Sequence, residues 1–188
     1  MRETFEPGRQ MPGSKALPGL KIGVSACLLG NLVRYDGGHK LQPWLLQALG
    51  PHVTYVPICP EVECGLPIPR EPMVLLGNPE NPRLVTLETG IDLSEQIWNW
   101  VEQKIAELTR EKLKGFIFKS KSPSCGLRGV ELFPQLGGLC EKTGVGIFAA
   151  AFRMAFPGIP VIDEVQLSEA QAREAFLQAL GLESTAII

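Results

Sequence analysis

The chain has 188 residues, of which 45% are hydrophobic and 20% charged, and its net charge at pH 7 is −2. This length suits one domain that buries a substantial core. The slightly acidic balance, with a sequence pI near 5.8, argues against a dedicated nucleic-acid-binding protein, and no apolar run is long enough to span a bilayer.

Residues 1–19 combine charged residues with Pro and Gly and lack the apolar centre of a secretory signal peptide. We interpret them as a flexible N-terminal arm, followed by a single domain over residues 20–188. The chain also has five cysteines. Without a secretory signal they indicate a cytoplasmic protein, because thiols in a reducing compartment more often bind metals or serve catalysis than form disulfides.

Apolar runs of strand length alternate with helical patterns along the domain. The predicted strands are residues 20–27, 53–58, 115–119 and 161–162, with an edge strand or hairpin at 84–87. The predicted helices are residues 41–49, 92–114, 146–156 and 168–181. This alternation predicts an α/β fold in which a mainly parallel, Rossmann-like sheet is flanked by helices.

Capping signals predict where two of these helices begin. Asp92 with Glu95 forms a capping pair for the long helix, and Ser168 with Gln171 forms one for the last helix. The long helix is expected to end near Gly115. Its core-facing residues at helical spacing are Ile97, Trp98, Val101, Ile105 and Leu108.

Two segments are predicted to be loops. Prolines at positions 60, 67, 69 and 72 are expected to exclude regular helix and to give that stretch a stiff, fixed path. Residues 120–145 form a long glycine-containing segment, and loops of that length inside a compact domain are usually functional.

Three cysteines follow three of the predicted strands: Cys27, Cys59 and Cys125. The carboxyl ends of parallel strands point toward one crevice, so these thiols are expected to meet there, although any one of them alone could simply be a small core residue. Three thiolates leave one position of a metal or cluster open. Their long spacings and the presence of only two histidines favour an iron–sulfur cluster over a structural zinc site.

Polar residues beside these cysteines are candidates for chemistry. Glu61, two residues after Cys59, is the preferred general acid or base, with Glu63 as the fallback. Ser122 and Ser124 precede Cys125 and could either hydrogen-bond a substrate or cap a turn.

Basic residues and two glycines lie in the same predicted loops. Arg34, Arg70, Lys119 and Lys121 would balance the negative charge of a thiolate-bound cluster, although exposed basic residues often serve only solubility. The sequence Gly144-Val145-Gly146 opens the Ala-rich helix, where the backbone could approach a ligand; it is not a dinucleotide-binding fingerprint.

Cys64 leaves a different class of function open. It lies five residues after Cys59 and could be a ligand, a resolving thiol or a residue without a role. A non-catalytic redox or metal-binding module, in which these two thiols cycle between dithiol and disulfide, and a zinc-stabilised scaffold therefore remain alternatives.

Together these segments resemble the DUF523 family, whose characterised members are thiouracil desulfidases. The resemblance begins near Leu20 and extends to the end of the domain. The matching motifs are SACLLG at 25–30, VRYDG at 33–37, CPEV at 59–62, GLP at 65–67, PR at 69–70 and SPSCG at 122–126.

The resemblance implies a [4Fe–4S] cluster held by Cys27, Cys59 and Cys125, with a fourth iron that binds the substrate's sulfur. It also implies assistance from Glu61 and from a serine at position 122 or 124. The activity expected is removal of sulfur from a thiolated pyrimidine such as thiouracil, giving the oxo base and sulfide. The expected substrate contacts are Ser25, Tyr35, Asp36, Arg70 and Lys119.

A small-molecule nucleobase is the expected partner, with no membrane association. The alternative within the same chemistry is desulfidation of thiolated nucleosides in tRNA, which some relatives perform with a second domain. We expect this chain to be too short for such a domain, and its acidic pI weighs against RNA.

Overall fold

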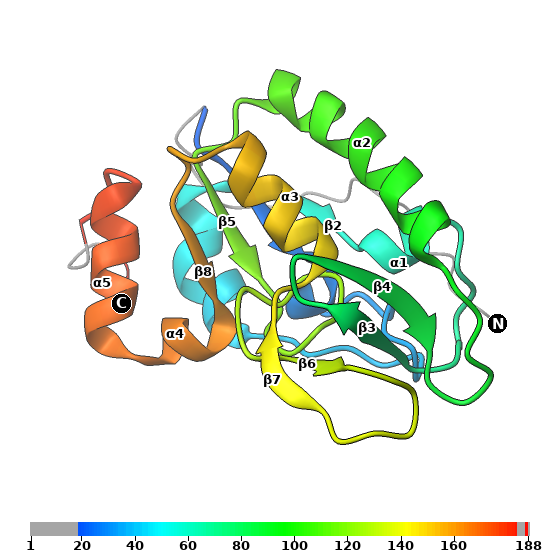
Figure 1. Ribbon diagram of the computed structural model, residues 1–188. Coiled ribbons are helices and arrows are strands. Elements are labelled where there is room, and N and C mark those ends of the chain that lie inside the picture. The colour runs from blue at the N-terminus through cyan, green and yellow to red at the C-terminus, as the bar shows by residue number, and fades with distance from the viewer. Residues whose placement is uncertain (1–18, 184–186, 188) are drawn as a thin grey trace, which may run out of the picture.

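The computed structural model describes residues 19–183 and residue 187, so the predicted arm lies outside the described residues apart from Gly19. Its first sheet has four parallel strands in the order β2–β1–β5–β8 (Figure 1). These strands are β1 (Lys21–Ser25), β2 (Thr54–Ile58), β5 (Gly115–Phe118) and β8 (Val161–Asp163). The prediction of an α/β domain with a parallel, Rossmann-like sheet is therefore confirmed.

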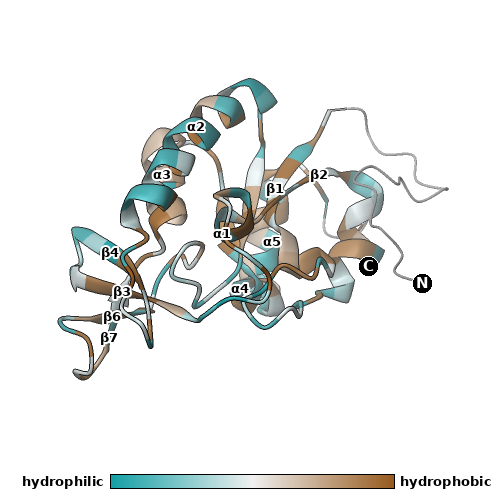
Figure 2. Cartoon of the chain, turned by 90° about the vertical axis from the view of Figure 1, so that its right-hand side faces the viewer, coloured by the Kyte–Doolittle hydropathy of each residue, from teal (hydrophilic) through white to brown (hydrophobic). Residues whose placement is uncertain are grey.

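Each face of this sheet packs on its own layer of helices. On β5, Phe116 and Phe118 contact the cluster that includes α2 (Ser94–Glu111) and α3 (Ile147–Ala155), whereas Ile117 faces the opposite cluster with α5 (Ala170–Ala179) and the short η2 (Leu45–Leu49). This alternation follows from the two-residue period of a strand. Figure 2 shows hydrophobic residues along β1 and β2 and hydrophilic residues along α2.

Packing across the sheet requires a glycine on β1. A Cβ atom on Gly23 would lie 2.2 Å from the ring of Phe116. That ring stacks on Phe118 at a centroid separation of 4.0 Å and contacts Phe152 edge-on at 4.9 Å. The missing side chain at position 23 thus makes room for the aromatic cluster that holds α3 on the sheet.

A second, mixed sheet lies beside the first, in the order β4–β3–β6–β7 (Figure 1). Its strands are β3 (Met73–Asn78), β4 (Asn81–Thr86), β6 (Val130–Phe133) and β7 (Glu141–Gly144). The hairpin prediction is confirmed, but the prediction of one long loop over 120–145 is wrong. The residues of β7 are mostly exposed and polar, so this strand is defined by its pairing with β6 rather than by an apolar pattern.

The long helix has different ends from those predicted. Helix α2 begins at Ser94, whose N–H donates to the Asp92 side chain, and it has no capping box with Glu95. It ends at Glu111 because Lys112 adopts a left-handed conformation with φ of 53°. Its buried residues are Ile97, Trp100, Val101 and Leu108, while the predicted Trp98 and Ile105 are only partly buried.

The remaining helices are short. Helix α1 (Pro60–Glu63) contradicts the prediction that prolines exclude regular helix here, because a proline is tolerated in the first turn. The chain also forms η1 (Ala26–Leu29), η3 (Gly50–His52) and α4 (Glu164–Ser168). The predicted Ser168–Gln171 capping box is wrong: Asp163 and Gln166 form one at the start of α4. Among the described residues, no helix combines the length and the apolar character needed to cross a membrane.

Candidate active site

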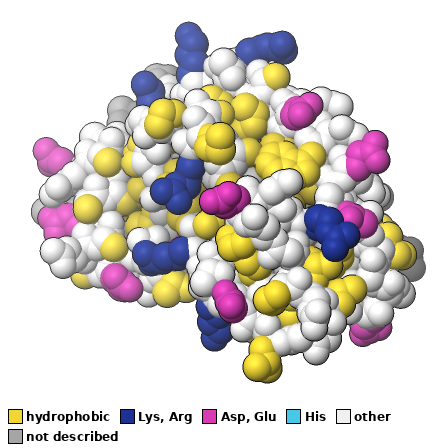
Figure 3. Space-filling view, in the orientation of Figure 1, with side chains coloured by type: hydrophobic (Ala, Val, Ile, Leu, Met, Phe, Trp, Pro, Cys, Tyr) yellow, Lys and Arg dark blue, Asp and Glu magenta, His cyan; other side chains and the backbone are white. Residues whose placement is uncertain are grey.

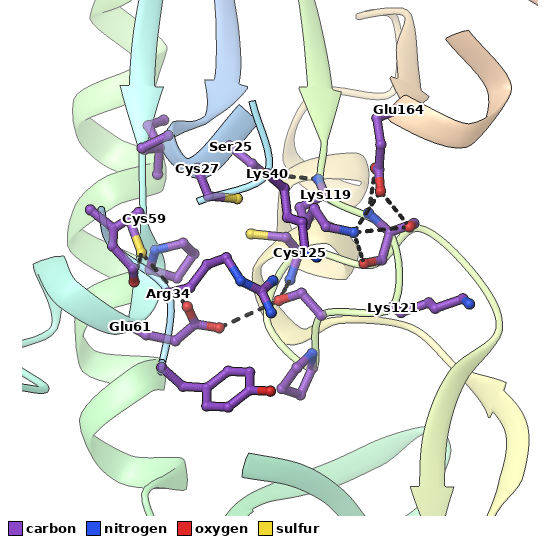
Figure 4. A pocket seen from close by; sticks show the side chains of 18 of the residues that line it. Ser25, Cys27, Arg34, Lys40, Cys59, Glu61, Lys119, Lys121, Cys125 and Glu164 are labelled. Carbon is purple, nitrogen blue, oxygen red and sulfur yellow. Dashed lines mark hydrogen bonds and ion pairs between the residues drawn. The ribbon is translucent and has the colours of Figure 1, made fainter. Parts of the chain in front are cut away.

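A cavity of about 560 Å³ lies where β1, β2 and β5 end, and all three predicted cysteines line it. Cys27 lies in η1 directly after β1, Cys59 follows β2, and Cys125 lies in the segment after β5. Figure 4 shows the three thiols at the carboxyl edge of the sheet, around one space. The predicted convergence of these thiols at this edge is what the fold produces.

Burial makes all three thiols weak acids. It raises the pKa of Cys27 to about 11, an effect that the nearby Lys119 partly offsets. Burial and then the Glu61 carboxylate raise the pKa of Cys59 to about 12, and burial raises the pKa of Cys125 well above its ordinary value. Without a bound cation these groups are therefore protonated at neutral pH.

The Cys125 turn is held by the backbone of α3. The first N–H groups of the helix donate to the turn, from Ile147 to the Pro123 carbonyl at 3.1 Å and from Phe148 to the Ser124 carbonyl at 2.9 Å. A Cβ atom on Gly146 would lie 2.6–2.7 Å from backbone atoms of residues 124–126. The glycine of the predicted Gly-x-Gly pair thus allows close approach of the chain to itself.

Glu61 occupies the centre of a small network beside Cys59. Its Oε2 forms an ion pair with Nη2 of Arg70 at 3.0 Å and lies 3.6 Å from the Cys59 sulfur. Its Oε1 accepts a hydrogen bond from Ser122 Oγ at 3.4 Å. Glu61 lines the cavity, whereas the fallback candidate, Glu63, does not.

The structure separates the two candidate serines. Ser122 lines the cavity, and its Oγ accepts hydrogen bonds from the N–H groups of Ser124 and Cys125 at 3.2 and 3.0 Å. Ser124 is completely buried, lies outside the cavity lining and has no hydrogen-bond partner for its hydroxyl. Of the two candidate serines, only Ser122 therefore lines the cavity.

Two predicted substrate contacts already have protein partners. Arg70 donates to the carbonyls of Val33 at 2.9 Å and Pro67 at 3.3 Å, in addition to its ion pair with Glu61. An ammonium group has three donors, and that of Lys119 has three acceptors: two oxygens of Ser120 and the Glu164 carboxylate. Both side chains line the cavity, but they hold other groups in place.

The other three predicted contacts differ in position. Ser25 lines the cavity, is buried, and its Oγ accepts the Lys119 N–H at 2.9 Å. Tyr35 lines the cavity and is 41% exposed, with the Arg34 guanidinium 5.3 Å from its ring centroid. Asp36 lies outside the lining; its side chain accepts the Gly38 N–H and pairs with Arg34 in a turn.

The fold and this cavity can be compared with known proteins. The model of the 2-thiouracil desulfurase family matches residues 22–164. The chain belongs to this family. Family membership confirms the resemblance inferred from the cysteine-containing motifs, and the matched region contains every cavity residue discussed above.

One related protein and one solved structure illustrate the similarity. The "Uncharacterized protein YbbK" of Bacillus subtilis (strain 168) is 30% identical over 153 residues, which cover 78% of this chain and 97% of that protein. A solved structure, "[4Fe-4S]-dependent thiouracil desulfidase TudS (DUF523Vcz)", is 35% identical and superposes with a TM-score of 0.63, covering 83% of this chain and 98% of its own. The 2-thiouracil desulfurase fold thus extends over most of the chain.

Sequence reasoning missed one acidic residue of the cavity. Glu164 follows β8 directly and binds the ammonium of Lys119 at 2.5 Å, the N–H of Ser120 at 2.7 Å and its hydroxyl at 2.6 Å. Figure 4 shows this network on the side of the cavity opposite Cys59. Its position at the end of a predicted strand, like that of the cysteines, was the signal that could have found it.

Proposed function

We propose that this member of the 2-thiouracil desulfurase family is a [4Fe–4S]-dependent desulfidase that removes sulfur from thiolated pyrimidines such as thiouracil. The products would be the oxo base and sulfide. The observation that carries the proposal is that Cys27, Cys59 and Cys125, from three separate segments, line one cavity together with Glu61. The five free cysteines of the chain fit the cytoplasmic location that we propose for it.

The donor set suits an iron–sulfur cluster. Cys27, Cys59 and Cys125 offer only sulfur, which iron–sulfur clusters and zinc prefer. A single zinc ion needs its sulfur ligands about 2.3 Å from one point. Within residues 19–183 and 187, no three Cys, His, Asp or Glu side chains are arranged to hold one ion. A cluster takes each thiolate at a separate corner, and the long spacings between these cysteines along the chain, with only two histidines, favour a cluster over a structural zinc site.

The burial of the cysteine thiols also fits a positively charged group bound among them. The raised pKa values of Cys27 and Cys59 mean that their thiolates need a positive charge to exist at neutral pH. When bound, a cluster with three protein ligands supplies an iron with an open coordination position, which binds sulfur and acts as a Lewis acid.

The side chains around the cavity would manage water and protons. Desulfidation replaces the sulfur of a thiocarbonyl with the oxygen of water: a C–S bond breaks, a C–O bond forms, and both protons of water end on sulfide. Glu61 is the acceptor best placed to take a proton from that water, because Arg70 and Ser122 fix its two oxygens. Ser122 donates its one proton to Glu61 and accepts two backbone N–H groups, so it holds the carboxylate in place at the cavity.

Anaerobic reconstitution tests the proposal directly. Purified protein is loaded with iron and sulfide, its content of both is measured, and sulfide release from 2- and 4-thiouracil is followed. Loading of about four irons and four sulfides per chain, with turnover of at least one substrate, is expected. Cys27→Ser, Cys59→Ser and Cys125→Ser should each lose iron, while Cys140→Ser, at an exposed position, should not. A fully loaded protein that leaves both compounds unchanged would overturn the proposal.

The acidic charge balance of the chain weighs against the tRNA alternative. Figure 3 shows basic and acidic side chains interspersed over one face of the protein, not gathered by sign. Binding to RNA would demand phosphate contacts and a steep loss of affinity with salt. Thiolated tRNA fragments, tested beside the free bases at low and high salt, distinguish the two substrate classes.

A further inference from the structure

Glu63 is tied to Cys59 by two hydrogen bonds. Its Oε1 accepts the backbone N–H of Cys59 at 2.8 Å, and its own N–H donates to the Cys59 carbonyl at 2.9 Å. Cys59 is the N-cap of α1, a position whose N–H is often bound by an acidic side chain from the first turn. The carboxylate therefore fixes the backbone of Cys59 at the point where the chain leaves β2.

The same carboxylate is anchored to the long helix α2. Its Oε2 forms an ion pair with Nζ of Lys104 at 2.9 Å. The Lys104 side chain is only 13% exposed and lies 5.9 Å from the Trp100 ring centroid, and it also pairs with Glu107 at 2.8 Å. Because α2 is packed on the core through its apolar face, Lys104 provides a fixed point.

The helical turn explains why two acidic residues have separate tasks. Successive residues of a helix are rotated by about 100°, so Glu61 and Glu63 project on nearly opposite sides of α1. Glu61 faces the cavity and pairs with Arg70, whereas Glu63 faces α2 and pairs with Lys104. The sequence Cys-Pro-Glu-Val-Glu thus carries one group for the cavity and one for the scaffold.

We propose that Glu63 is a positioning residue for Cys59, holding this thiol at the cavity by joining its backbone N–H to Lys104 of α2. The proposal rests on the proposed function, in which Cys59 is a cluster ligand. Cys59 is 9% exposed, so removal of the carboxylate leaves an N–H with little access to water and without its acceptor. The turn then relaxes, and the sulfur loses its fixed place.

Thiol reactivity in the cluster-free protein tests this role without any assay of activity. The variants are Glu63→Ala, Glu63→Gln and the matched control Glu107→Gln, which removes the other ion pair of Lys104 but no contact to Cys59. Alkylation by iodoacetamide is followed by peptide mass spectrometry at Cys59 and Cys27, with the exposed Cys140 as internal reference. Circular dichroism confirms that each variant is folded.

Glu63→Ala should raise the alkylation rate of Cys59 roughly fivefold, the factor expected for one lost hydrogen bond, and leave Cys27 unchanged. Glu63→Gln keeps an acceptor and loses the charge, so its rate should lie between those of parent and Ala variant. Glu107→Gln should match the parent. Equal Cys59 rates in folded Glu63→Ala and Glu107→Gln would overturn the proposal.

A second measurement separates this proposal from the proposed function. Iron and labile sulfide retained after reconstitution and gel filtration should fall in Glu63→Ala relative to Glu107→Gln. If the parent protein never binds a cluster, the proposed function fails, yet the alkylation rates still decide whether Glu63 positions Cys59. If the parent binds a cluster and Glu63→Ala retains it equally, the positioning role fails alone.

Discussion

The turns that present Cys59 and Cys125 to the same cavity are held by different forces. Around Cys59, charged side chains from distant segments form ion pairs: Arg70 with Glu61, and Lys104 with Glu63. Around Cys125, backbone groups meet at close range, with the N–H groups of α3 on the carbonyls of the turn and Gly146 against its backbone.

This difference predicts different weaknesses. An ion pair inside the protein is costly to break when one partner is removed, because the other charge stays buried. Where backbone atoms already touch, no charge is involved, but an added side-chain atom has no room. Substitutions at the first turn should therefore act through charge, and substitutions at the second through volume.

The largest effect is expected at Arg70. Its side chain is 5% exposed and that of Glu61 is 14% exposed. Arg70→Met leaves the carboxylate buried without its cation and should lower the free energy of unfolding by about 3 kcal/mol. The control is Arg83→Met, whose ion pair with Asp92 has 58% and 43% exposed side chains and should contribute under about 1 kcal/mol. Urea unfolding of the two variants measures the difference; similar losses would contradict a buried, strong pair.

Gly146→Ala tests the volume limit at the second turn. The new Cβ meets backbone atoms that have no rotamer to change, so the Cys125 turn must move. We expect a loss of about 2 kcal/mol, which corresponds to a decrease in Tm of roughly 4–8 °C in a chain of this size, together with reduced iron binding. Gly158→Ala is the matched control, because nothing lies within 4 Å of its Cβ position. Equal Tm values for both variants would show that the turn accommodates the methyl group.

Glu164 binds the start of the segment that leads to Cys125, and its contribution to the free energy of unfolding is expected to depend on pH. Burial opposes its ionisation, but hydrogen bonds from Lys119 and Ser120 outweigh burial and lower its pKa from 4.5. Its stabilising contribution is thus present above about pH 4.5 and is lost as pH falls through the lower folded-state pKa.

The variant Glu164→Gln isolates this contribution. It should cost about 1.5–2 kcal/mol at neutral pH, the lower part of the range for hydrogen bonds to a charged group. Unfolding of parent and variant between pH 3 and 7 measures the gap, which should narrow below about pH 4.5. A gap that stays constant over this range would assign the stabilisation to shape instead of charge.

The smallest effect is expected at Cys64. Its Sγ donates to the Glu61 carbonyl at 3.2 Å, and it lies outside the cavity lining. Cys64→Ser keeps a donor at this place and should change stability by less than about 1 kcal/mol while retaining cluster and activity. If this variant lost activity while it still bound iron and sulfide, the result would instead support the dithiol–disulfide alternative.

The parallel sheet was predictable because its central strands β1 and β5 are buried on both faces and appear as continuous apolar runs. The mixed sheet was only partly predictable. Val130 and Leu132 are buried on either side of exposed Glu131, an alternation that indicates β6, but β7 has no apolar signal and exists through its partner.

The candidate site, like the fold, was predictable only in part. Strand ends bring the three cysteines to one edge, so their convergence followed from local pattern. The sequence pattern did not show which polar groups remain free, because Arg70 and Lys119 each have a partner far along the chain, at Val33 and at Glu164. Likewise nothing local separates Ser122 from Ser124; the docking of α3 onto their turn does so.

The deep placement of the three thiols has a consequence for how the protein survives exposure to air. Thiolate is the form that oxidants and disulfides attack, and burial raises the pKa of Cys27 to about 11, so very little of this thiol is ionised at neutral pH. Without a bound metal, the Cys27 thiol should therefore resist oxidation and stay reduced.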